Sequence, residues 1–355
     1  MIITDIRAEK IGLELNKPIV ISMGTITQGD TVIVKITTDT GICGYGEGAG
    51  VSFVTGETPE SVMGTINLLR PHLLGINPFS IDHIHSTMDR VIVRNSSAKA
   101  ALDIALYDIM AKAQGLPLYR LLGGIRNTME TDMTIMIDSP ELMADQAEDI
   151  VSRGFSMLKV KAGINPYEDI AAIRQIRERV GPGIDIKVDA NQGWSVGDST
   201  RILDELYALG VSAVEQPIPY WDLDGLAYIR SKTRLKLMAD ESCFTPQDAI
   251  SLIRRQAVDI INIKLMKCGG LYRGMQINTI AESAGVKCML GCMMESNLAI
   301  TAGAALVASR SNFVYGDLDS VFHHKGNPRI RGGATASGGI LTLSEKPGLG
   351  IEVDM

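Results

Sequence analysis

Short apolar runs in the second half of the chain end in charged residues, and these residues follow a definite order. The end residues are Lys159 with Lys161, then Asp189, Glu215, Asp240 and Lys264. They recur about every 25 residues, which is the length of one strand–helix unit in a β/α barrel. Because a barrel brings the carboxyl ends of its strands to one face, the spacing predicts three carboxylates between two sets of lysines at one mouth.

The three carboxylates, Asp189, Glu215 and Asp240, have the chemistry of a site for a hard divalent cation. Oxygen ligands without histidine or cysteine favour Mg²⁺, and Mn²⁺ is the second ion that they suit. Acidic residues after strands often serve as helix caps or solvated loop charges, but three matched positions on consecutive strands favour a metal. Asn191, two residues after Asp189, is expected to support these ligands or to hold a metal-bound water.

The lysines supply candidate bases on two sides of the predicted mouth. Residues two apart in a strand face the same side, so Lys159 and Lys161 project together. Lys264 would reach the site from the opposite side of the barrel. A base on each face allows a proton to be removed from one side of a carbon and returned on the other, which is racemisation or epimerisation. Lys267, three residues after Lys264, is interpreted as an ordinary surface lysine.

The elements that must position these residues follow from the pattern around them. Strand-like residues 31–37, a turn at 39–41 and a returning strand at 42–46 predict a hairpin, and 59–123 are helical, with one clear helix from Asn95 or Ser96 to Gly115. Alternating strands and helices from about 131 to 317 predict a parallel barrel of eight strands. We expect an α+β capping domain at 1–125, the barrel at 126–322, and a segment at 323–355 that returns to the cap.

Composition excludes several other kinds of protein. A net charge of -7 with no basic cluster argues against a nucleic-acid partner. No stretch is long and apolar enough to cross a bilayer, and no leader is apparent at the start. Five scattered cysteines fit buried thiols in a reducing compartment. We therefore expect a cytoplasmic protein that acts on a small molecule.

Taken together, the Lys159-x-Lys161 pair, Asp189, Glu215, Asp240 and Lys264 resemble the enolase superfamily, in its muconate-lactonising-enzyme subgroup. The resemblance covers nearly the whole chain and is closest to dipeptide epimerases of the L-Ala-D/L-Glu epimerase type. It implies a modified (β/α)7β barrel, one Mg²⁺ per subunit, removal of a proton next to a carboxylate, and a homo-oligomer. It also implies that Lys161 and Lys264 are the acid/base pair, that Lys159 is an electrostatic helper, and that Glu241 orients Lys264.

Substrate binding is expected at two further places. Asp317 and Asp319 end the eighth strand run with both carboxylates on one side, and the pair resembles the motif by which dipeptide epimerases hold the free α-amino group of their substrate. The cap loop at about 17–28 covers the site in the family, and relatives specific for L-Ala-Glu carry an arginine where this chain has Gly24. The neighbouring Met23, with Met294, then predicts an apolar rather than acidic side chain on the second residue.

Other functions stay open at this stage. A muconate-type cycloisomerase, an N-succinylamino acid racemase or an o-succinylbenzoate synthase would use the same barrel, but their substrates gain nothing from the anions of Asp317 and Asp319. A mandelate-racemase-like dehydratase would use a histidine as the second base. A Schiff-base aldolase would leave three carboxylates unexplained. A barrel kept only for binding or structure would bind Mg²⁺ without exchanging substrate protons.

Overall fold

The structure, a computed structural model, describes residues 1–22 and 24–355. Eight parallel strands form a nearly closed barrel, in the order β14-β13-β12-β11-β10-β9-β8-β7. These strands are β7 (Met133–Ile135), β8 (Met157–Lys161), β9 (Asp185–Asp189), β10 (Ala213–Glu215), β11 (Lys236–Ala239), β12 (Ile260–Lys264), β13 (Lys287–Gly291) and β14 (Phe313–Asp317). The predicted barrel is confirmed, and each of its strand runs forms a strand.

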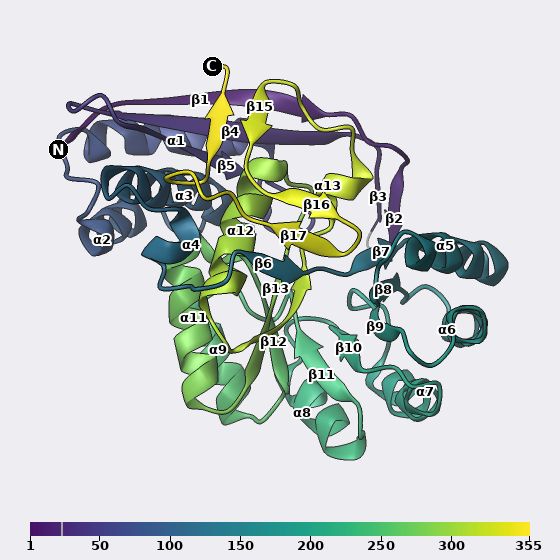
Figure 1. The fold of residues 1–355 in the computed structure, drawn as a ribbon. Coiled ribbons are helices and arrows are strands. Elements are labelled where there is room, and N and C mark those ends of the chain that lie inside the picture. The colour runs from purple at the N-terminus through teal and green to yellow at the C-terminus, as the bar shows by residue number, and fades with distance from the viewer. Residues whose placement is uncertain (23) are drawn as a thin grey trace.

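Helices connect the strands and surround the barrel, as Figure 1 shows. They are α5 (Pro140–Ser152), α6 (Pro166–Val180), α7 (Val196–Ala208), α8 (Leu223–Lys232), α9 (Pro246–Arg254), α10 (Leu265–Cys268), α11 (Leu271–Ser283), α12 (Asn297–Ser309) and α13 (Ser320–His323). The helix α9 begins as its sequence predicts, with Thr245 as N-cap in a capping box and Pro246 in the first turn. No helix in the described part of the chain is long and apolar enough to span a bilayer.

The register of the barrel places the charged strand ends at one level. Lys161 pairs with Asp189, and Asp189 pairs with Glu215. On the other side, Lys264 pairs with Gly291, which pairs with Asp317. Because paired residues lie side by side across neighbouring strands, these side chains come to the same mouth.

The cap is an antiparallel sheet with helices packed on it. The sheet has β1 (Ile3–Leu13), β4 (Gly29–Thr38) and β5 (Cys43–Gly48), and a separate hairpin has β2 (Ile19–Ile21) and β3 (Gly24–Ile26). The cap helices are α1 (Pro59–Leu73), α2 (Ile81–Val91), α3 (Ser96–Ala113) and α4 (Leu118–Leu121). The helix α3 can lie directly on β5 because Gly46 has no side chain: a Cβ there would lie 1.9 Å from the carbonyl oxygen of Ala101.

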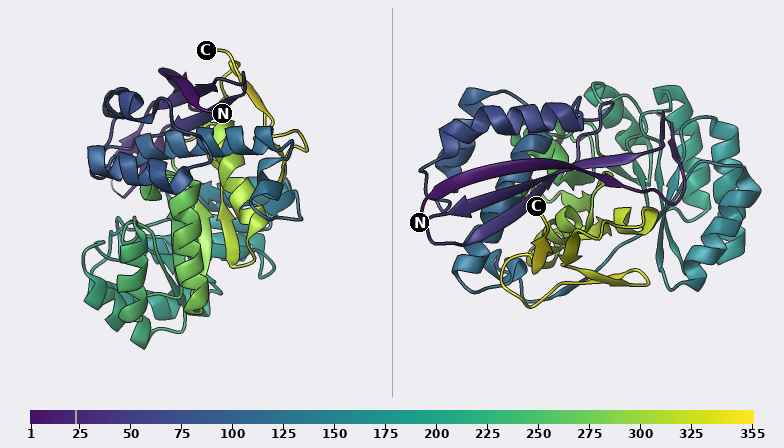
Figure 2. Two further views of the ribbon diagram at one scale, coloured as in Figure 1. Left: turned by 90° about the vertical axis from the view of Figure 1, so that its left-hand side faces the viewer. Right: turned by 90° about the horizontal axis from the view of Figure 1, so that it is seen from above.

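The C-terminal segment returns to the cap, as expected. It contains β15 (Ile330–Gly332), β16 (Thr335–Ser337), β17 (Ile340–Thr342) and β18 (Ile351–Val353), and β17 pairs with β6 (Thr128–Glu130). Arg329 holds Glu9 of β1 through two hydrogen bonds of 2.7 Å. Figure 2, viewed from above, shows both termini beside the cap sheet. The exact domain limits at 125 and 322 stay a prediction.

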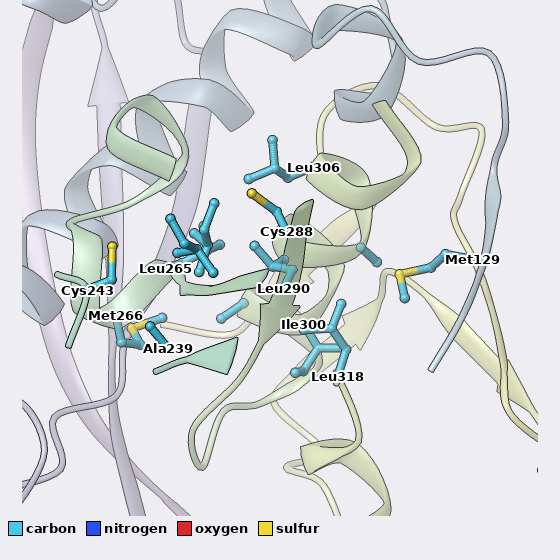
Figure 3. Packing of buried hydrophobic residues seen from close by; sticks show 14 of the residues in the cluster. Met129, Ala239, Cys243, Leu265, Met266, Cys288, Leu290, Ile300, Leu306 and Leu318 are labelled. Atoms are coloured by element: carbon cyan, nitrogen blue, oxygen red, sulfur yellow. The ribbon is translucent and has the colours of Figure 1, made fainter. Parts of the chain in front are cut away.

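One apolar core runs from the cap into the barrel. The same buried cluster includes Ile33 of β4 and Leu158 of β8. Figure 3 shows part of this core, with Leu290 of β13 and Ile300 and Leu306 of α12 among its side chains. A core that crosses the boundary fixes the cap over the barrel mouth.

Buried carboxylates of the cap also hold the barrel helices by their N-termini. Glu47 of β5 accepts hydrogen bonds from the backbone N–H groups of Ser296 at 2.8 Å and Ala299 at 3.0 Å, at the start of α12. Asp103 of α3 accepts from the N–H of Leu271 at the start of α11. Anionic groups at helix N-termini satisfy unpaired N–H groups and the helix dipole, so these contacts set the position of the cap.

Replacement of Glu47 by leucine is expected to lower the free energy of unfolding by about 2–3 kcal/mol, because buried N–H groups lose a charged acceptor. Urea denaturation measures the loss, and Glu47→Gln, which keeps one acceptor oxygen, should lose less. Glu60, an exposed residue of α1, serves as the control, with Glu60→Gln expected near wild type. Unchanged stability of Glu47→Leu would show that this contact does not tie the cap to the barrel.

Candidate active site

Asp189, Glu215 and Asp240 meet at the carboxyl ends of β9, β10 and β11. One carboxylate oxygen from each lies within 4.8 Å of the others, and all three side chains are buried. Burial, with Asp189 beside it, raises the pKa of Glu215 to about 7. Lys161 and Lys159 outweigh burial at Asp189 and lower its pKa to about 2.

This group fits Mg²⁺. Three buried carboxylates repel one another, and a divalent cation between them removes that cost. The donor set is all oxygen, as Mg²⁺ prefers. Glu241, next to Asp240 in the chain, also points to a ligand site. Its Oε2 atom is buried and has no hydrogen-bond partner among the described residues.

The lysines surround the carboxylates from both sides. Lys161 Nζ lies 2.8 Å from Asp189 Oδ2, and Lys264 Nζ lies 2.9 Å from Asp240 Oδ2. The strands that carry them, β8 and β12, are four places apart in an eight-stranded order, so they face each other across the barrel. Burial alone would lower the pKa of Lys264, but Asp240 and Glu215 outweigh it and raise the pKa.

Lys159 lies at the centre of the charged groups. Its Nζ is 3.1 Å from Asp189 Oδ2, 2.9 Å from Glu215 Oε2 and 2.7 Å from Asp317 Oδ2. These anions outweigh burial and raise its pKa well above the usual value. Lys159 therefore stays positively charged and links the metal-type carboxylates to the Asp317 side of the mouth.

Lys267 is not the surface lysine that the sequence suggested. Its side chain is fully buried, and its Nζ lies 2.6 Å from Asp240 Oδ1 and also bonds the carbonyl oxygens of Asp240 and Asn262. The prediction was wrong because α10 is a short turn that points Lys267 inward, and no spacing rule reveals such a turn. Lys267 and Lys264 thus hold different oxygens of Asp240.

Two amides hold the charged side chains of the site in place. Asn191 Oδ1 accepts from Lys161 Nζ at 2.9 Å, while its Nδ2 donates to Glu241 Oε1 at 3.2 Å. The link of Glu241 to the lysines therefore runs through Asn191, and its orientation of Lys264 stays a prediction. Asn262 Nδ2 donates to Glu215 Oε1 at 2.7 Å. The sequence carried a signal for Asn262, since it lies two residues before Lys264 on the same strand face.

Asp317 and Asp319 do lie together, in a second group with Asp132. Protein cations already accompany this group: Lys187 Nζ is 2.5 Å from Asp132 Oδ2, and His323 Nε2 is 3.1 Å from Asp319 Oδ2. Lys187 lies two residues before Asp189, so the strand pattern could have identified it as an inward side chain.

A hollow of about 680 Å³, open to solvent, joins the two groups. Its polar lining includes Lys159, Lys161, Asn191, Asp240, Glu241, Lys264, Asp317, Asp319 and His323. Its apolar lining includes Ile19, Ile21, Ile26, Val51, Phe53, Val54, Met136, Met293 and Met294.

The hairpin of β2 and β3 forms the cover of this hollow. Ser22 Oγ donates to the backbone oxygen of Asn191 at 3.0 Å, which fastens the hairpin to the barrel loop after β9. Met294 lines the hollow, and Gly24 lies at the start of β3, outside the residues that line it. Met23 lies outside the described residues. The substrate contacts expected of Gly24, Met23 and Met294 stay predictions.

Gly291 leaves the space that Lys264 occupies. A Cβ at Gly291 would lie 2.7 Å from Asn262 Oδ1 and 3.0 Å from Lys264 Cε. We expect Gly291→Ala to destabilise the protein by about 1–3 kcal/mol through overpacking, and to lower kcat because Lys264 moves. Gly64→Ala on α1, where a Cβ meets no atom within 4 Å, is the matched control for thermal unfolding and activity. Wild-type kcat in Gly291→Ala would contradict this reading.

Comparison with known families agrees with the geometry. The N-terminal domain of mandelate racemase / muconate lactonizing enzyme matches residues 3–123, and an enolase C-terminal domain-like family matches residues 142–355. The chain belongs to this enolase-like family, as the sequence predicted.

Individual relatives match over nearly the full length. A hydrophobic dipeptide epimerase of Enterococcus faecalis is 44% identical, with 98% of each chain covered. An N-succinyl-L-Arg/Lys racemase of Bacillus cereus is 41% identical, covering 100% of this chain and 96% of the relative. The crystal structure of a dipeptide epimerase from E. faecalis with Mg and L-Leu-L-Tyr superposes with a TM-score of 0.97 at 43% identity, over 99% of this chain and 100% of that chain.

Proposed function

We propose that this protein is a Mg²⁺-dependent dipeptide epimerase, an isomerase that inverts the α-carbon of the C-terminal residue by 1,1-proton transfer through an enolate. The observation that carries the proposal is the placement of Lys161 and Lys264 on opposite sides of a mouth that also presents Asp317 and Asp319. Two facing bases suit inversion, and a pair of anions suits the free ammonium of a dipeptide.

Asp189, Glu215 and Asp240 would hold the Mg²⁺. When bound, the ion stabilises the negative charge that develops on the substrate carboxylate as the α-proton leaves. Lys267 and Lys264 hold Asp240, and Lys161 and Lys159 hold Asp189, so both carboxylates are fixed before substrate arrives.

Lys161 and Lys264 carry the protons. For one epimer, the lysine on the side of the α-proton accepts it in the neutral form, and the ammonium of the lysine on the other side delivers a proton to the opposite face. Asp240 and Glu215 raise the pKa of Lys264, and a divalent cation held by them would offset their charge and favour that neutral form. For the other epimer the two roles exchange. Lys159 stays charged between Asp189, Glu215 and Asp317, and acts by charge and position.

The apolar cover favours an apolar side chain on the second residue. Ile19, Ile21, Ile26 and Phe53 line the hollow from the cap, and no arginine or lysine of the cap is among its lining residues in the described part of the chain. A carboxylate side chain would enter this cover without a cation to receive it, which costs free energy.

The similarity to an N-succinyl-L-Arg/Lys racemase suggests a second candidate function, racemisation of N-succinyl amino acids. A succinyl group is anionic, so it would meet Asp317 and Asp319 as like charges, whereas a dipeptide ammonium meets them as opposite charges. The two aspartates therefore favour the dipeptide.

Incubation in D₂O with Mg²⁺ and a library of L,L-dipeptides tests the proposal, with mass spectrometry as the readout. We expect a gain of one mass unit at the C-terminal residue, fastest for apolar side chains and slow for Glu. Exchange with N-succinyl amino acids but with no dipeptide would overturn the assignment of Asp317 and Asp319.

We further propose that the protein is a cytoplasmic homo-oligomer. All five cysteines are free thiols, which is the form expected in a reducing compartment. The oligomer is expected from the family resemblance. Light scattering coupled to gel filtration measures it directly, and a monomer at micromolar concentration would contradict it.

A further inference from the structure

A histidine that the sequence reasoning did not identify lies beside the proposed ammonium site. His323 is the last residue of α13, lines the hollow, and has a side chain that is 14% exposed. Its Nε2 lies 3.1 Å from Asp319 Oδ2. Because histidine titrates near neutral pH, a histidine in this place can change the charge of the site under ordinary conditions.

The oxygens of the two aspartates are unequally engaged. Asp319 Oδ2 accepts the backbone N–H of Thr134 at 2.7 Å as well as His323, and Asp317 Oδ2 accepts Lys159 at 2.7 Å. Among the described residues, the hydrogen-bond donor recorded for Asp319 Oδ1 is a weak one, the thiol of Cys292, with Sγ at 3.8 Å. Asp319 Oδ1 is therefore available to accept a hydrogen bond from a ligand cation.

Charged groups from several elements surround His323. Burial would lower its pKa, but Asp319 and then Asp317 outweigh burial and raise it, while Lys161 of β8 opposes them. His324, the next residue, is also affected by His323, and burial lowers the pKa of His324. Asp132 lies in the same carboxylate group and is paired with Lys187 of β9. In the free protein the balance favours a His323 cation paired with the Asp319 anion.

We propose that His323 makes binding at this site depend on pH: it positions Asp319, and it releases one proton to solvent when the ammonium of a dipeptide binds there. The inference rests on the proposed function. The ring keeps its Nε2–H donated to Asp319, the Nδ1 proton passes to solvent, and the substrate ammonium takes over the charge. A neutral N-acyl group brings no cation and releases no such proton.

The sign of the pH dependence follows from this exchange. An ammonium next to Asp319 makes a second cation on His323 unfavourable, so bound dipeptide lowers the pKa of His323. Dipeptide affinity is then weak at low pH, where His323 holds its proton, and rises with pH by up to about tenfold per unit until His323 is neutral. The effect appears in KM for dipeptides rather than in kcat.

Calorimetry in buffers of different ionisation enthalpy counts the protons released on binding. Wild type with an apolar dipeptide, added as a pre-equilibrated mixture of epimers, is expected to release up to about one proton per site more than with the N-acetylated dipeptide near pH 6. His323→Gln keeps a donor for Asp319 but cannot titrate, so it should lose this difference. His83→Gln, an exposed histidine on α2, is the matched control and should keep it.

Kinetics and NMR give independent readouts. The KM of wild type should fall with rising pH between about pH 5.5 and 7.5, and that of His323→Gln should be flat. NMR titration of the His323 ring in wild type, which needs no variant, should show a lower pKa with dipeptide bound. Equal proton release in wild type and His323→Gln, with epimerisation intact, overturns the role of His323 alone. Absence of both binding and exchange with every dipeptide overturns the proposed function as well.

Discussion

Replacement of Lys264 by alanine is expected to stop epimerisation while leaving exchange of the α-proton for one epimer. Loss of one positioned acid/base group typically costs about 10²–10⁴-fold in rate. Only one face of the substrate then keeps a base, Lys161, so one epimer can still lose and regain its proton on that face. Lys161→Ala should give the mirror result, with exchange retained for the other epimer.

Both variants should keep the arrangement of the remaining charged side chains in the site. Without Lys264, Asp240 keeps Lys267 at 2.6 Å. Without Lys161, Asp189 keeps Lys159 at 3.1 Å and the backbone N–H of Asn191 at 2.9 Å. Each variant therefore removes one base and leaves both carboxylates with a partner.

Proton NMR in D₂O, started separately from the L,L and the L,D epimer, measures exchange and inversion in one experiment. Lys236→Ala is the matched control, because Lys236 is exposed and lies at the amino end of β11, away from the mouth. Its rates should match wild type. Equal loss of exchange from both epimers in Lys264→Ala would show that Lys264 supports Asp240 rather than acting as one of two bases.

The barrel and its charged strand ends were predictable because they depend on local rules. Strands of parallel barrels are short, buried and regularly spaced, and functional residues lie at or just after their carboxyl ends. The same rules predicted the β4–β5 hairpin and the return of the tail. These rules place Asp189, Glu215 and Lys264 at one mouth because the register of neighbouring strands brings the strand ends to the same level of the barrel.

Residues after the strand ends were harder to predict. Lys267 and His323 lie in short helical turns, α10 and α13, whose direction depends on packing against the rest of the mouth. Glu47 contacts α12 across 249 residues of sequence, so no local pattern relates the two. Such contacts appear only when the cap is placed on the barrel, since their partners come from different parts of the chain.

Removal of Mg²⁺ is expected to abolish exchange for both epimers, whereas loss of one lysine leaves exchange for one epimer. It should also lower the thermal stability of the protein. Asp189, Glu215 and Asp240 bring three carboxylates within 4.8 Å of one another. A ligand that binds only the folded state stabilises it by about 2.7 kcal/mol at 100 times its dissociation constant. A chelator should therefore lower Tm and stop α-proton exchange, and added Mg²⁺ should restore both.

The variant Asp189→Asn distinguishes the effect of losing a metal-binding carboxylate from a general effect on the stability of strand β9. It should lose activity by several powers of ten, because charge stabilisation of the enolate is worth several kcal/mol, and its Tm should respond little to Mg²⁺. Asp185→Asn, at the other end of the same strand, is the matched control and should keep both the activity and the Mg²⁺ response. Metal-free exchange at the wild-type rate would mean that the lysines around this site suffice without a cation. An equal loss in Asp185→Asn would mean that strand β9, rather than the carboxylate at its end, carries the effect.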